Sequence, residues 1–97
     1  MTLRLSLRAE RDIEDIRSNL IARSPQGADR VRAALASDME ILERFPYSGR
    51  ATDFAEIRIL PVVRYPYLIY YTVASSEVVI VHVRHSSRGA PDPRDLR

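Results

Sequence analysis

Residues 66–85 read PYLIYYTVASSEVVIVHVRH, and this stretch decides the fold class. Two runs rich in β-branched and aromatic residues, 66–73 and 77–85, predict two strands. The residues between them, 74–76, are few enough for a hairpin connection, although they lack the favoured Asn-Gly pair. The second run is apolar on both sides at its start, which is typical of a central strand. Its alternation places three valines on one face and two apolar residues on the other: Val79, Val81 and Val83 against Val78 and Ile80.

Two further strands are predicted outside this hairpin. Residues 57–63 alternate, with Ile57 and Ile59 on one side, and Pro61 indicates an edge position or a bulge. Near the N-terminus Leu3, Leu5 and Leu7 alternate with polar residues, which predicts a short, half-buried strand.

Between these strands, residues 9–45 change to helical spacing and predict two helices joined by a tight turn. Ser24 and Pro25 form a good start for the second helix, and Pro46 ends it. A polar loop follows, with a turn at residues 47–50. The apolar stripes of the two helices are Ala9, Ile13, Ile16 and Leu20, then Ala28, Val31, Leu35, Met39, Leu42 and Phe45.

The predicted order is therefore β-α-α-β-β-β in an α+β domain. We expect a helical hairpin packed on one face of a small, mainly antiparallel four-stranded sheet. With the Ile57 face beneath the helices, the other face is partly open and carries Arg58 and Arg84. We interpret residues 1–97 as one domain with a folded core at 1–88. Residues 89–97 contain two prolines and no periodicity, which predicts an irregular tail.

The composition excludes several kinds of site and locates the positive charge. The chain has 97 residues, and all of its 15 basic side chains are arginine, since lysine is absent. It has no cysteine, which excludes disulfides and thiolate metal sites. Residues 1–56 carry nine arginines and ten acids, whereas 57–97 carry six arginines and three acids, so positive charge gathers in the C-terminal part. No apolar run is long enough for a membrane span, and arginines interrupt the N-terminus too often for a signal peptide, so we expect a cytoplasmic protein.

Several common sites are not expected. His82 and His85 lie three apart on a strand and point to opposite faces, so we predict no metal site, and no motif implies a cofactor. No serine is marked as a nucleophile, and the three glycines lie too far apart for a phosphate loop. The helix carboxylates fit a solvated face, and Glu56 is better explained as a loop acid than as a general base.

The arginines and histidines leave two interpretations open. Guanidinium groups suit phosphate recognition, and a histidine can donate a proton near neutral pH, so these residues fit RNA cleavage. They also fit strand ends that need charge for solubility. Tyrosines in the predicted strands can stack on bases or fill the core, and the core is the simpler assignment.

The order and spacing of several motifs resemble the RelE/ParE superfamily of toxins from type II toxin–antitoxin systems. The resemblance runs from Leu3 to about Arg88. Its motifs are Ala9-x-x-Asp12-Ile13-x-x-Ile16, Phe45-Pro46-Tyr47-Ser48-Gly49-Arg50, Ile57-Arg58-Ile59-Leu60, Tyr65-Pro66-Tyr67-x-Ile69-Tyr70-Tyr71 and Val79-Ile80-Val81-His82-Val83-Arg84-His85-x-x-Arg88. The resemblance implies a β-α-α-β-β-β toxin that is neutralised by a cognate antitoxin and is associated with plasmid stabilisation.

Two activities divide this superfamily: RelE-type members cleave ribosome-bound mRNA, and ParE-type members inhibit DNA gyrase. RelE-type nucleases place a basic residue where this chain has Tyr67, use lysines that are absent here, and carry a tyrosine that is missing from residues 86–97. The residues therefore favour a gyrase inhibitor that is not an enzyme. The target-binding surface would be Arg58, Arg84, His85 and Arg88. The alternative is an mRNA endoribonuclease that uses Arg58, Arg64, Arg84 and His85.

Antitoxin binding is expected on apolar positions of the open sheet face, which a partner helix would cover. The candidates are Leu60, Val62 and Leu68. A second alternative is a non-toxic module that keeps only antitoxin binding. The sequence does not determine the oligomeric state.

Overall fold

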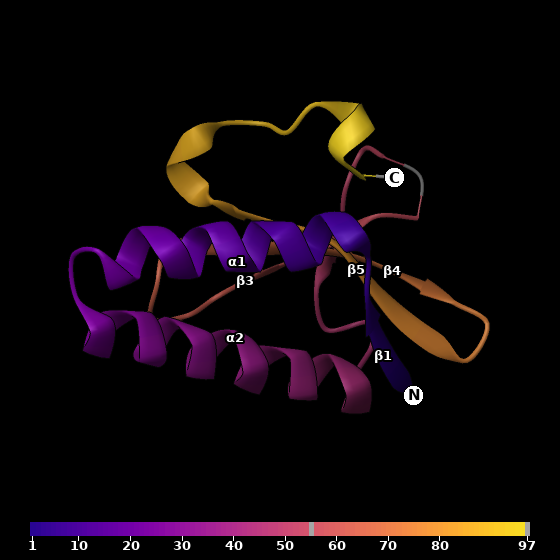
Figure 1. Ribbon diagram of the computed structural model, residues 1–97. Helices are drawn as coiled ribbons and strands as arrows, with labels where there is room; N and C mark the ends of the chain where they lie inside the picture. Colours follow the sequence, from indigo (N-terminus) through magenta and orange to yellow (C-terminus); the bar gives the residue numbers. More distant parts are fainter. Residues whose placement is uncertain (55, 97) are drawn as a thin grey trace.

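The computed structural model describes residues 1–54 and 56–96 as an α+β fold, which confirms the predicted class. Two helices follow the first strand, and the remaining strands come after the helices (Figure 1). The elements are β1 (Thr2–Leu5), α1 (Leu7–Ile21), α2 (Pro25–Arg44), β2 (Arg50–Ala51), β3 (Arg58–Pro61), β4 (Tyr67–Ala74), β5 (Glu77–His85) and the short 3₁₀-helices η1 (Ser86–Arg88) and η2 (Pro93–Leu96).

The sheet has five strands rather than four, in the order β1-β5-β4-β3-β2. The additional strand is β2, where the sequence predicted only a turn and a loop, because Arg50 and Ala51 pair with Ile59 and Arg58. Strands β2 to β5 are antiparallel, and β1 joins the edge of β5 in parallel. β5 is therefore central, as its apolar sequence predicted.

Several boundaries differ from the predicted ranges for local reasons. β3 ends at Pro61 instead of running to residue 63, although the Val62 N–H still donates to the carbonyl oxygen of Tyr67 at 2.9 Å. The first strand ends at Leu5, because the Ser6 hydroxyl accepts the N–H of Ala9 and caps α1. α2 begins at Pro25 with Ser24 as its N-cap, as predicted.

Two apolar clusters lie on the two sides of the sheet. The larger contains helix residues such as Val31 and Leu35 together with Ile69, Tyr71 and Ile80. The smaller contains Ile57, Ile59, Tyr70, Val79 and Val81 and no residue of α1 or α2. The expected assignment of the faces was therefore wrong: the helices cover the Leu60 side of β3, not the Ile57 side.

A bulge in β5 changes the predicted alternation. Tyr70 pairs with His82, but Tyr71 pairs with Ile80, so Val81 is an extra residue in its strand. After the bulge, Val83 lies with Val78 and Ile80 in the cluster beneath the helices instead of with Val79 and Val81. A one-residue insertion reverses the faces of all later side chains, and strict alternation cannot anticipate it.

The C-terminal segment returns over the second face of the sheet. It runs back along α1 towards the start of that helix, on the side away from α2 (Figure 1). Residues 93–96 form η2 within the segment predicted to be an irregular tail, and the side chain of Leu96 is 6% exposed in the smaller apolar cluster. The C-terminal segment therefore covers part of this face of the sheet, which was predicted to be partly open.

Candidate functional site

Three of the predicted site residues, Arg84, His85 and Arg88, line a hollow at the C-terminal end of β5. β1 pairs with β5 only as far as Ile80, so the rest of this strand edge faces α1 directly. The hollow has a volume of about 340 Å³ and lies between α1, the end of β5 and η1. The acidic, arginine and histidine residues that line it are Asp12, Asp15, Arg23, His82, Arg84, His85 and Arg88, and its less polar wall includes Ile16, Leu20 and Tyr67.

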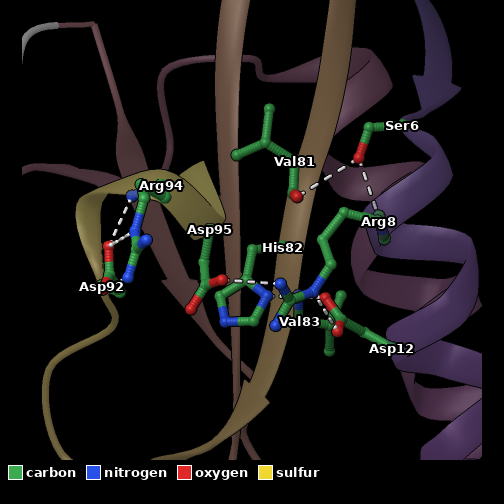
Figure 2. Close-up of polar contacts among 10 residues, drawn as sticks. Ser6, Arg8, Asp12, Val81, His82, Val83, Asp92, Arg94 and Asp95 are labelled. Atoms are coloured by element: carbon green, nitrogen blue, oxygen red, sulfur yellow. Dashed lines mark hydrogen bonds and ion pairs between the residues drawn. The ribbon is translucent and has the colours of Figure 1, made fainter. Parts of the chain in front are cut away.

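Asp12 replaces the missing strand partner along this edge. One carboxylate oxygen, Oδ2, lies 2.6 Å from His82 Nδ1 and accepts the backbone N–H of Val83 at 3.0 Å. The other oxygen, Oδ1, accepts a hydrogen bond from Arg8 Nε at 2.9 Å. Arg8 also pairs through Nη1 with Asp95 of η2 at 2.6 Å, so a continuous polar network joins α1, β5 and the C-terminal segment (Figure 2).

The environment of Asp12 favours its ionised form. Burial raises the pKa of this carboxyl group, but the hydrogen bonds from His82, Arg8 and the Val83 N–H outweigh burial. The pKa of Asp12 therefore lies below its usual value. The same pairing raises the pKa of Arg8. Because the ionised carboxylate of Asp12 is already paired with Arg8, it contributes little unpaired negative charge to the hollow.

The sequence did not identify Asp12 or the position of His82. Asp12 was expected on a solvated helix face and His82 was assigned no buried partner, yet Asp12 is 9% and His82 only 3% exposed. A signal was present, because Asp12 lies three residues after Ala9 and four before Ile16, within the buried stripe of its helix. A carboxylate on such a stripe needs a buried partner, and the bulge at Val81 supplies one in His82.

Arg84, His85 and Arg88 are brought together at the rim of the hollow. Arg84 Nη2 donates to the carbonyl oxygen of Arg88 at 2.9 Å, while its buried Nε has no partner among the described residues. His85 Nδ1 lies 2.7 Å from Ser87 Oγ and accepts the N–H of Ser87 at 3.1 Å. The His85 ring meets Tyr67 edge-on, with centroids 5.4 Å apart. These contacts fix Arg84 and His85, whereas the side chain of Arg88 is exposed at the end of η1.

The structure does not bring Arg58 or Arg64 to the same place. Arg58 donates to the carbonyl oxygens of Gly49 at 2.7 and 3.0 Å and of Tyr47 at 3.3 Å, and its guanidinium lies 5.3 Å from the Tyr47 ring centroid. It therefore fastens the turn before β2. Arg64 lines a different hollow, between α2 and the β3–β4 connection.

The three apolar positions proposed for antitoxin binding do not form one surface. Val62 is 6% exposed and belongs to the core beneath the helices, where Leu60 also packs. Leu68 packs on the opposite face of the sheet. Large apolar side chains are exposed elsewhere, notably Phe45 and Tyr47 at the end of α2 and Val63 after β3.

The remaining candidates have simpler roles. Tyr67, Tyr70 and Tyr71 are at most 9% exposed, so they fill the core rather than offer rings for base stacking. Glu56 is exposed in the loop before β3. Across residues 1–54 and 56–96, the structure contains no group of three or more metal-ligating side chains and no helix long and apolar enough to cross a membrane.

Comparison with known proteins agrees with this architecture. Residues 3–89 match the family model described as the ParE toxin of the type II toxin–antitoxin system, parDE. The chain belongs to the ParE toxin family. This ParE-family toxin is 32% identical over 89 residues to Y4kP of Sinorhizobium fredii, covering 92% of each chain. It is 38% identical over 81 residues to the toxin RelE2 of Caulobacter vibrioides, covering 84% of this chain and 90% of that protein.

A solved structure shares the fold of this ParE-family toxin. The chromosomal ParDE toxin–antitoxin system from P. aeruginosa aligns with a TM-score of 0.80, over 88% of this chain and 95% of that chain. The sequence identity in that alignment is 19%, so the likeness concerns the fold alone. The matching family model is named for ParE and one relative is named RelE2, and the expected resemblance to the RelE/ParE superfamily is confirmed.

Proposed function

We propose that this ParE-family toxin inhibits DNA gyrase, that a cognate antitoxin neutralises it, and that it does not act as a nuclease. The observation that carries the proposal is the dispersal of the alternative nuclease residues. Arg84 and His85 line the hollow beside β5, Arg64 lines another hollow, and the Arg58 guanidinium is bonded to backbone carbonyls. Phosphodiester cleavage needs these groups around a single phosphate, and this arrangement does not supply that set.

The buried histidine supports the same conclusion. Asp12 and His82 have the geometry of an acid that orients a base, with Nδ1 on the carboxylate. However, His82 Nε2 is buried, and a general base must come within hydrogen-bond reach of the proton that it removes. The pair holds α1 against β5, and Nε2 of His82 would have to be uncovered before it could remove a proton from a substrate.

The target-binding surface in this proposal consists of Arg84, His85 and Arg88. These residues come from β5 and η1 and surround one hollow, where Arg84 and His85 are held by short contacts and Arg88 presents an exposed guanidinium group. Side chains that are already fixed lose less entropy on binding, which favours Arg84 and His85 as contacts. Arg58, which the sequence placed in the same surface, is better assigned to the fold.

The direct test compares the two activities on one protein preparation. We expect the purified toxin to inhibit supercoiling by DNA gyrase and to leave ribosome-bound mRNA intact. Arg88→Gln should weaken the inhibition. Arg11→Gln makes the same charge change at an exposed position of α1 outside the hollow, and it should leave the inhibition unchanged. Cleavage of the mRNA with unaffected supercoiling would overturn the proposal.

The second candidate is a RelE-type endoribonuclease. One observation favours it: Arg84, His85 and Arg88 do gather around one hollow beside Tyr67. This candidate predicts that Arg84→Ala or His85→Ala abolishes mRNA cleavage while antitoxin binding survives. A non-toxic module makes a third prediction, namely that expression without an antitoxin leaves growth unchanged.

A further inference from the structure

The hollow beside β5 collects guanidinium groups that have no acidic partner. Arg23 follows the end of α1, Arg84 lies near the end of β5 and Arg88 ends η1. Within residues 1–54 and 56–96, none of the three forms an ion pair, and the side chains of Arg23 and Arg88 donate no hydrogen bond. By contrast, Arg4 and Arg8 are paired with carboxylates.

Two buried nitrogen atoms at the same place also lack partners. They are Nε2 of His82, whose side chain is 3% exposed, and Nε of Arg84. His82 and Arg84 are two residues apart on β5 after the bulge, so they lie on one face of the strand and both line the hollow. Buried polar groups without partners are uncommon in folded proteins, and here they coincide with the cationic rim.

The wall of the hollow selects the kind of anion. Ile16 and Leu20 of α1 and the ring of Tyr67 form a less polar side next to the guanidinium groups. Asp15 is exposed at the same hollow. It offsets one of the three guanidinium charges, so the hollow suits a single negative charge better than a polyanionic phosphodiester chain. A single carboxylate on a hydrocarbon stem fits both features, because the stem covers the apolar side and the carboxylate reaches the arginines.

We infer that the hollow formed by Arg23, Arg84 and Arg88 binds an acidic side chain, with glutamate as the best match, from a protein partner of the toxin. This inference rests on the proposed function, because it assumes that the partner at this surface is a protein rather than RNA. It adds the chemistry of the recognised group and the apolar contacts at Ile16 and Leu20. The hollow of about 340 Å³ is large enough for one such side chain.

The test uses two capped peptides, Ala-Leu-Glu-Leu-Ala and its glutamine counterpart, and a short oligothymidylate as the nucleic-acid probe. Each is titrated into the full-length ¹⁵N-labelled toxin, and the backbone and Arg Nε–H resonances are followed by NMR. We expect the glutamate peptide to bind at least about fivefold more tightly than the glutamine peptide, since only the former makes a charge-assisted contact. The largest shifts should fall on residues 82–88.

Matched variants locate the binding. Arg88→Gln removes an exposed guanidinium group and should weaken the binding of the glutamate peptide about threefold to tenfold. Arg84→Gln should do the same, with thermal unfolding as a check because Arg84 also bonds to the chain at Arg88. Arg11→Gln, which makes the same charge change outside the hollow, should have no effect.

Equal binding of the two peptides would overturn the inference, as would tighter binding of the oligothymidylate at residues 82–88 or an unchanged affinity in Arg88→Gln. Gyrase supercoiling is measured in parallel to separate this inference from the proposed function. Inhibition of supercoiling without glutamate selectivity refutes the acidic-side-chain site alone. Glutamate-selective binding without inhibition refutes the gyrase proposal alone.

Discussion

Asp12 connects more parts of the molecule than its place on a surface helix suggested. Its two oxygens hold His82, the Val83 N–H and Arg8 (Figure 2). We expect Asp12→Ala to lower the free energy of unfolding by about 2–4 kcal/mol, because it leaves buried donors without acceptors. Urea denaturation measures this loss. Asp15→Ala, an exposed change on the same helix, is the control and should alter stability by less than about 0.5 kcal/mol.

The ionisation of Asp12 gives this stabilisation a pH dependence. The folded-state pKa of Asp12 lies below its unfolded value of about 3.9, so the carboxylate form stabilises the fold. Its contribution is complete above the unfolded pKa and is lost as the pH falls through the folded pKa. We therefore expect the stability difference between the natural toxin and Asp12→Asn to shrink as the pH falls below about 4. A difference that stayed constant down to pH 2 would contradict this assignment.

Gly49 is required for close packing at the turn before β2. A Cβ atom there would lie 2.6 Å from Tyr71 Oη and 2.7 Å from the carbonyl oxygen of Ile59. The Gly49 N–H also donates to Tyr71 Oη at 2.9 Å. We expect Gly49→Ala to lower the free energy of unfolding by about 1–3 kcal/mol. Gly27→Ala in α2 should have a smaller net effect, because its Cβ would lie 3.2 Å from Ser24 Oγ and alanine favours the helix.

At the scale of elements, the C-terminal segment acts as a cover for the second face of the sheet. Leu96 of η2 is buried with Tyr70, Val79 and Val81, and Arg8 pairs with Asp95 next to it. The half-exposed ion pair contributes less than about 1 kcal/mol, so the apolar contact dominates. We expect Leu96→Ala to cost about 2 kcal/mol or more and to raise amide exchange in η2. The side chain of Leu7 is 63% exposed, so Leu7→Ala should change neither the free energy of unfolding nor the amide exchange of η2 appreciably.

The helices and strands also show which parts of the fold could be predicted from the sequence. The limits of β5, the start of α2 and the helical hairpin followed from periodicity and capping residues. β2 could not be predicted, because two residues have no period and exist as a strand only through their pairing with β3. The face of Val83 and the burial of His82 depend on the bulge at Val81, which is a property of the pairing between β4 and β5.

At the scale of the whole molecule, part of the excess positive charge of residues 57–97 can be assigned to one surface. The N-terminal arginines are balanced by acids, and the C-terminal excess of positive charge includes Arg84 and Arg88 at the hollow. Under the proposed function, we expect the association rate with gyrase to fall several-fold between about 50 and 300 mM salt, because screening weakens attraction to an acidic surface. Surface plasmon resonance measures this rate. Arg88→Gln should reduce the salt dependence, and a slope equal to that of the natural toxin would count against this surface.

The sequence by itself determined the order of the elements apart from β2, the central position of β5 and the toxin family, because these depend on local periodicity, capping and the spacing of motifs along the chain. Only the tertiary structure decided which arginines act together. Arg58 and Arg84 have similar sequence surroundings, yet one closes a turn and the other lines the hollow. The physical reason is that β1 stops at Leu5, which leaves an edge of β5 for Asp12 to hold. Such a site forms from distant segments and has no local pattern.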